Sequence, residues 1–203
     1  MSRNRGEFRT NRLAGYLLIL LLAPMLTACS GGGDDDGPPP VACLDLDFIK
    51  AIGTVNAGSV YLRRSNNLSC SIVEVEVAIS NLSSIFTVGF DLTYPGAVVE
   101  YDSAILGPLL QKDTPTNPPF MIVTPGAGNV MVSVTRLAPD PSIGAVGSEV
   151  LLTLKFRKVA TGTGVIDFDS SGSSAVNEIV QDENGVTRPA TFGPDHGGMV
   201  VVP

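Results

Sequence analysis

Few residues in this 203-residue chain could perform chemistry. The single histidine, His196, lies in Pro194–Gly198, whose glycines are typical of a surface turn between two strands. Covalent catalysis needs a nucleophile beside a base, and no Gly-x-Ser-x-Gly motif is present. The histidine and the cysteines also lack the spacing of a zinc site. We therefore predict that the protein is not an enzyme and has no catalytic residues, no metal ligands and no cofactor.

Two acidic segments could bind calcium, but each has a simpler interpretation. Asp34, Asp35 and Asp36 lie between glycines and prolines, where nothing rigid would hold their carboxylates together. The segment Asp182–Gly185 has too few acidic ligands for a full calcium loop. Its Asn-Gly pair is instead a strong signal for a two-residue hairpin. We interpret the first segment as a solvated tether and the second as a turn.

The N-terminus has the features of a secretory signal peptide. A basic start is followed by an apolar segment, Leu13–Met25, and by small residues before Cys29. The apolar segment is shorter than the roughly 18–20 residues of a transmembrane helix, so an uncleaved anchor is the less favoured alternative. Leu26–Cys29 resembles the lipobox of bacterial lipoproteins. This resemblance implies a signal peptide over 1–28 and lipidation of Cys29.

The residues that follow Cys29 predict a flexible tether and a cellular location for the protein. Glycine, aspartate and proline dominate Ser30–Pro40, and such a composition buries little apolar surface. We expect a lipidated, flexible tether over residues 29–42. Ser30 resembles the residue that sends lipoproteins to the outer membrane. The expected location is therefore extracytoplasmic, in the cell envelope, with the lipid anchor in the outer membrane.

Net charge and cysteine content indicate which partners and which covalent cross-links to expect in the mature chain. Residues 1–28 contain four arginines and one glutamate, so their removal changes the formal net charge from −7 to −10. A nucleic-acid partner is not expected, because such proteins carry a basic footprint. With Cys29 lipidated, Cys43 and Cys70 remain and are candidates for a disulfide outside the cytoplasm. In the chain-entropy model this bond would stabilise the fold by roughly 3–4 kcal/mol.

Apolar and polar residues alternate with period two through most of the remaining chain, which is typical of half-buried strands. The clearest strands are expected at 73–79, 86–94, 130–135, 150–157 and 166–168. Shorter strands are expected at 60–63, 98–101, 120–123 and 199–202. The pattern predicts an all-β domain over 43–203, a single jelly-roll or Greek-key β-sandwich of about nine strands.

In chain order, these strands resemble the cohesin family of jelly-roll modules. Gly89–Tyr94 is similar to the family's x-Phe-x-Leu-x-Tyr strand, and Gly147–Phe156 resembles its G-x-x-Leu-x-x-Ile-x-Phe strand. Val176–Val202 resembles its closing segment. Tyr94–Gly96 departs from the family's common Tyr-Asp-Pro. The fold is related to that of some carbohydrate-binding modules.

The resemblance implies a non-catalytic, membrane-tethered binding module. In cohesins, one sheet face binds a dockerin, a small calcium-binding helical module on another protein. The implied partner is therefore a dockerin-bearing or other extracytoplasmic protein, with a link to polysaccharide degradation. Matched strand by strand, the partner-binding face contains Thr87, Gly89, Asp91, Thr93, Met131, Ser133 and Thr135. The same residues would also suit the ordinary solvated face of a sandwich.

Three further functions remain open alternatives. Direct carbohydrate binding would be favoured by Tyr61, Tyr101 and Phe120 lying coplanar and exposed, although the chain has no tryptophan. A hydrolase would need a cleft with two carboxylates near His196. A structural subunit of an envelope assembly would show a large apolar surface patch.

Overall fold

The computed structural model describes residues 46–51, 55–66, 69–169, 178–192 and 196–203. The chain divides into two units, 1–40 and 41–203, and every described residue belongs to the second. The signal peptide, the tether, Cys29 and Cys43 therefore lie outside the described residues. The disulfide between Cys43 and Cys70 stays a prediction for the same reason. Within the described segments, no helix has the length and hydrophobicity needed to cross a membrane.

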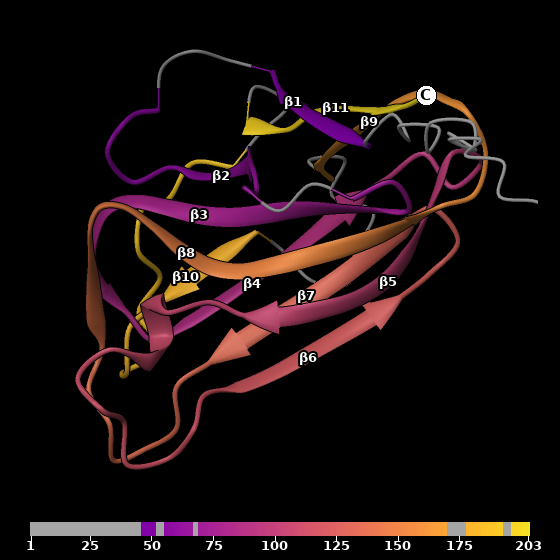
Figure 1. The fold of residues 1–203 in the computed structure, drawn as a ribbon. Helices are drawn as coiled ribbons and strands as arrows, with labels where there is room; N and C mark the ends of the chain where they lie inside the picture. Colours follow the sequence, from indigo (N-terminus) through magenta and orange to yellow (C-terminus); the bar gives the residue numbers. More distant parts are fainter. Residues whose placement is uncertain (1–45, 52–54, 67–68, 170–177, 193–195) are drawn as a thin grey trace, which may run out of the picture. The chain divides into compact units, whose positions relative to one another are not determined.

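Eleven strands and one 3-10 turn occur in the described residues, and the strands form two antiparallel sheets (Figure 1). The larger sheet has the order β1 (Asp47–Lys50), β11 (Gly198–Val202), β9 (Gly162–Phe168), β4 (Thr87–Thr93), β7 (Asn129–Thr135) and β6 (Phe120–Pro125), and β10 (Ile179–Gln181) also pairs with β4. The smaller sheet has the order β2 (Val60–Arg64), β3 (Ile72–Ile85), β8 (Ile143–Lys158) and β5 (Val99–Leu106). The 3-10 turn η1 covers Leu109–Gln111.

The predicted all-β sandwich is confirmed. The number of strands exceeds the expected nine because β1 and β10 have only four and three residues. Segments this short contain too few alternations to show a period of two. The two sheets are joined where β3 ends at Ile85 and β4 begins at Thr87, so that Phe86 alone separates a strand of one sheet from a strand of the other.

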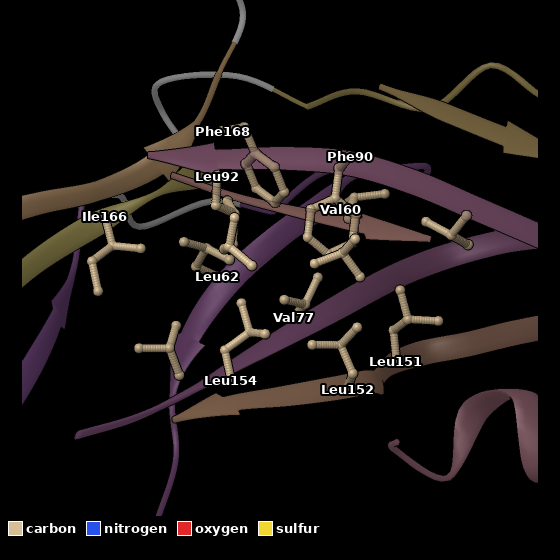
Figure 2. Close-up of a cluster of buried hydrophobic side chains, with 14 of the residues drawn as sticks. Val60, Leu62, Val77, Phe90, Leu92, Leu151, Leu152, Leu154, Ile166 and Phe168 are labelled. Carbon is tan, nitrogen blue, oxygen red and sulfur yellow. The ribbon is translucent and has the colours of Figure 1, made fainter. Parts of the chain in front are cut away.

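The core lies between the two sheets and is filled by aliphatic and aromatic side chains. Figure 2 shows Phe90 and Leu92 of the larger sheet pointing toward Val77 and Leu154 of the smaller sheet. All four side chains are fully buried. The rings of Phe90 and Phe168 pack edge to face, with centroids 5.6 Å apart. Burial of each such side chain stabilises the fold by roughly 1.5–3 kcal/mol, so this core positions the outer faces rigidly.

A β-bulge in β8 changes which residues face the core. The alternation predicts that Leu151 points outward, opposite in phase to Leu152 and Leu154. This prediction is wrong, because Leu151 is as fully buried as Leu152. Val77 pairs with Leu152 and Ala78 pairs with Val150, so Leu151 is an extra residue between them.

Two buried aspartates fix loops at the ends of the sandwich. Asp140 accepts hydrogen bonds from the backbone N–H groups of Thr116 and Asn117 at 2.8 and 3.2 Å. Asp182 accepts hydrogen bonds from the N–H groups of Asn184 and Val186 through one carboxylate oxygen, both at 2.9 Å. Its second oxygen pairs with Arg188 at 2.6 Å. A hairpin turn is present here, but the predicted two-residue loop Asn184–Gly185 is wrong, because Asp182 N–H bonds the Val186 carbonyl and leaves the three residues 183–185 in the loop. The Asp182 carboxylate is engaged in forming this turn.

We expect these two carboxylates to make the stability of the domain fall in acid. The N–H of Thr116 is the main group that holds the pKa of Asp140 below its ordinary value of 3.8. The N–H of Val186, followed by that of Asn184 and the charge of Arg188, does the same for Asp182. The unfolded chain therefore binds protons more readily than the folded domain, so this stability is present above pH 3.8 and is lost below it.

Urea unfolding of the protein and of Asp182→Asn between pH 7 and pH 2 measures this effect, because the variant lacks one of the two titrating carboxyls. The fall of the midpoint below about pH 4 should be smaller in Asp182→Asn than in the parent. Asp113→Asn, at an exposed position, should keep the parent profile. Identical profiles for Asp182→Asn and the parent would contradict the assignment.

Candidate functional site

The outward side of β6, β7 and β4 forms one continuous surface. Cross-strand pairing places Phe120 opposite Thr135 and Thr135 opposite Thr87. The next row pairs Ile122 with Ser133, and directly opposite side chains of an antiparallel sheet lie on the same face. We call this surface the β6–β7–β4 face and define it by eight accessible side chains: Thr87, Thr93, Phe120, Ile122, Thr124, Met131, Ser133 and Thr135.

The β6–β7–β4 face is uncharged and combines three apolar side chains with five that carry hydroxyl groups. Phe120 and Ile122, two positions apart on β6, are 52% and 50% exposed. Ile122 and Met131 line a shallow pocket of about 190 Å³, together with Thr124, Val132 and Ser133. The Thr87 and Thr135 hydroxyls bond each other across the strands at 2.7 Å. None of the eight side chains carries a charge, so covering this face would desolvate no ion.

All seven residues predicted for a partner-binding face lie on this side of β4 and β7, since each pairs with another outward residue across the strands. The expectation of an open polar face is wrong at Gly89 and Asp91, which are buried. At the far edge of β4, Ile179 of β10 pairs with Gly89, and Asp169 N–H donates to the Asp91 carbonyl at 2.9 Å. The binding role of the remaining residues stays a prediction.

The sequence-based prediction missed the exposed apolar residues of β6. Residues 120–123 were expected to form a strand, but their alternation does not say which strand lies beside them. The pairing of Ile122 with Ser133 makes β6 the edge strand next to β7. Two large apolar residues two positions apart, Phe120 and Ile122, were the available signal.

The outer face of the smaller sheet has the opposite character. Arg63 pairs with Glu76 at 2.6 Å, and Lys155 pairs with Glu74 at 2.8 Å. Arg157 of β8 pairs with Glu100 of β5 at 2.9 Å. These ions are already paired and keep part of their hydration, which a covering partner would remove at a cost in free energy. Of the two outer faces, the β6–β7–β4 face is the one suited to being covered.

A second apolar row lies at the other end of the larger sheet. Ile49 pairs with Met199 across β1 and β11, and Met199 pairs with Val165 of β9. The three side chains are 49%, 41% and 59% exposed. Between this row and the β6–β7–β4 face, four acidic residues gather around the centre of β4. We call them the acidic junction: Asp91, Asp167, Asp169 and Glu178.

The structure gives little support to a sugar-binding platform. Tyr61 is only 4% exposed and its hydroxyl is hydrogen-bonded to Ser148. Tyr101 packs edge to face against Phe156, and Phe120 belongs to the other sheet. Tyr61, Tyr101 and Phe120 therefore form no coplanar, exposed group.

A pocket at one end of the sandwich does not resemble a hydrolase cleft. It has a volume of about 540 Å³ and is lined by residues at one end of the sandwich, among them Tyr94, Val99 and Val159. Its one carboxylate, Glu100, is ion-paired with Arg157, and His196 does not line it. The arrangement offers no nucleophile beside a base.

The sequence matches no family model and no curated protein. Solved structures, by contrast, share its fold. The cohesin CaCohA2 from Clostridium acetobutylicum, solved in complex with a variant of CaDoc0917, is 16% identical and matches with a TM-score of 0.53, covering 71% of this chain and 99% of that one. A type II cohesin domain from the cellulosome of Acetivibrio cellulolyticus is 15% identical, with a TM-score of 0.51 and coverage of 72% and 94%.

A cohesin module from a family 33 glycoside hydrolase of Clostridium perfringens is 12% identical and matches with a TM-score of 0.50, covering 72% of this chain and 97% of that one. At these identities the similarity concerns the fold. The chain therefore contains a β-sandwich domain with the cohesin fold.

Proposed function

We propose that this protein is a non-catalytic binding module that docks a dockerin-like module of an extracytoplasmic protein through the β6–β7–β4 face. The observation that carries the proposal is an uncharged outer sheet face with Phe120 and Ile122 half exposed, on a domain with the cohesin fold. Large apolar side chains left in water on a rigid sheet are the usual centre of a protein interface.

Structural neighbours support the class of partner. CaCohA2 was solved in a complex with CaDoc0917, and a type II cohesin from Acetivibrio cellulolyticus, with a TM-score of 0.50, was solved in a cohesin–X–dockerin complex. The β6–β7–β4 face of this chain is hollowed only by the shallow pocket beside Ile122 and Met131. A flat face suits a folded partner better than a small molecule, since small ligands are usually bound in concave sites.

The N-terminal segments complete the proposal. Lipidation of Cys29 would anchor the protein in the outer membrane, and residues 29–42 would hold the sandwich away from the lipid surface. A dockerin-bearing protein would then be retained at the cell envelope. Two neighbours come from a cellulosome and from a glycoside hydrolase, which supports a partner active in polysaccharide degradation.

Affinity capture from an extract of the producing organism, followed by binding of the purified pair, tests the proposal. The expected result is retention of a protein with a dockerin-type calcium-loop repeat, lost when calcium is chelated. Capture of no such protein, together with binding to insoluble polysaccharide, would contradict docking and favour carbohydrate binding.

A further inference from the structure

The acidic junction forms where two short strands share one edge of β4. Residues 87–89 of β4 pair with β10, and Leu92 and Thr93 pair with the end of β9. Asp91 lies between these two pairings. On one side Asp169 donates its N–H to the Asp91 carbonyl at 2.9 Å, and on the other Glu178 directly precedes the residue that pairs with Gly89. Asp167 pairs with Thr93 one row away.

The two acidic side chains at the centre of this junction have buried carboxylate oxygens without hydrogen bonds. The Asp91 side chain is 1% exposed, and neither of its carboxylate oxygens accepts a hydrogen bond. Oε1 of Glu178 is also buried without a hydrogen bond. A buried carboxylate costs a great deal of free energy unless it is paired or coordinates a cation.

The electrostatics of the junction favour a cation. Burial raises the pKa of Glu178, and the negative charges of Asp167, Asp169 and Asp91 raise it further. Three neighbouring carboxylates therefore make the surroundings of Glu178 negative. Like charges on paired strands destabilise a sheet, and a bound cation would remove that repulsion.

We propose that the acidic junction binds a calcium ion between the carboxylates of Asp91 and Glu178. Asp167 and Asp169 contribute negative charge at its rim. The described residues contain no group of three or more His, Cys, Asp or Glu side chains already arranged to hold a metal ion. The ion is therefore held by the buried carboxylate of Asp91 and the partly buried carboxylate of Glu178, and water completes its coordination. The expected dissociation constant is about 10⁻⁴–10⁻³ M, as in other extracellular modules.

Calcium fits this position better than magnesium. It accepts six to eight oxygen ligands in flexible geometry, whereas magnesium needs a near-ideal octahedron and loses water reluctantly. The ion would join β4 to the start of β10 and the end of β9, next to the β6–β7–β4 face. The inference concerns the isolated protein and does not depend on the docking proposal.

Thermal unfolding of the purified protein at pH 7 tests the site, with calcium chloride, magnesium chloride or potassium chloride of equal ionic strength and with no partner present. We expect 10 mM calcium to raise the melting temperature by about 5 °C, with a half-maximal effect near 0.1–1 mM. Magnesium should have a smaller effect and potassium none. An equal rise in all three salts, or no rise with calcium, would overturn the proposal.

Substitutions locate the effect. Asp91→Asn and Glu178→Gln should each abolish the response to calcium while the calcium-free proteins still unfold cooperatively. Asp102→Asn, at an exposed position in β5 of the other sheet, should respond like the parent. If Asp91→Asn fails to fold, Glu178→Gln alone decides the result. A response of both junction variants equal to that of the parent would place calcium elsewhere. The absence of a partner keeps this result separate from any result on docking.

Discussion

Replacing Ile122 by aspartate should weaken binding of the docked partner by about 100-fold or more, equivalent to about 2.7 kcal/mol. Ile122 is 50% exposed on the edge strand β6, so the folded domain should accept the charge in water. In the complex the same carboxylate would be buried against apolar groups without a partner. Loss of apolar contact and desolvation of the charge then act in the same direction.

The control for this variant is another isoleucine of matched exposure. Ile105, on β5 at the edge of the smaller sheet, is 53% exposed. Surface plasmon resonance with the purified partner should show unchanged affinity for Ile105→Asp, and both variants should melt within a few degrees of the parent. Equal losses of affinity in the two variants, or full affinity of Ile122→Asp, would rule out the β6–β7–β4 face as the docking surface.

Replacing Phe90 by alanine should lower the free energy of unfolding by about 3–5 kcal/mol. Phe90 is completely buried at the middle of β4, and its ring packs edge to face against Phe168 (Figure 2). The smaller side chain leaves a cavity that the two rigid sheets cannot close. Since small domains are stable by only about 5–15 kcal/mol, this single change removes a large part of the total.

Chemical denaturation with urea measures this loss, and Thr93→Ala provides the control on the same strand. Thr93 is exposed, so its truncation should change the free energy of unfolding by less than about 0.5 kcal/mol. A loss below about 1 kcal/mol for Phe90→Ala would show that the sheets can collapse around the cavity, contrary to the packing described here.

Local alternation predicted the orientation of most strand residues. In β4 and β7, side chains two positions apart share a face, so the inward set around Phe90 and the outward set around Ser133 follow from the order of residues alone. The same reasoning was wrong at Leu151, because one extra residue in β8 reverses the phase of the alternation. A bulge is decided by how β8 pairs with β3, a contact between residues far apart in sequence.

The amino-acid sequence by itself determined the class of the fold and the inward side of regularly paired strands such as β4 and β7, because both follow from a period of two in neighbouring residues. The tertiary structure alone decided which strands lie side by side. That pairing made β6 an edge strand with Phe120 and Ile122 exposed, and it buried Asp91 beneath the ends of β9 and β10. Accessibility depends on the neighbouring strand, and a strand's neighbour is chosen by long-range pairing that no local pattern encodes.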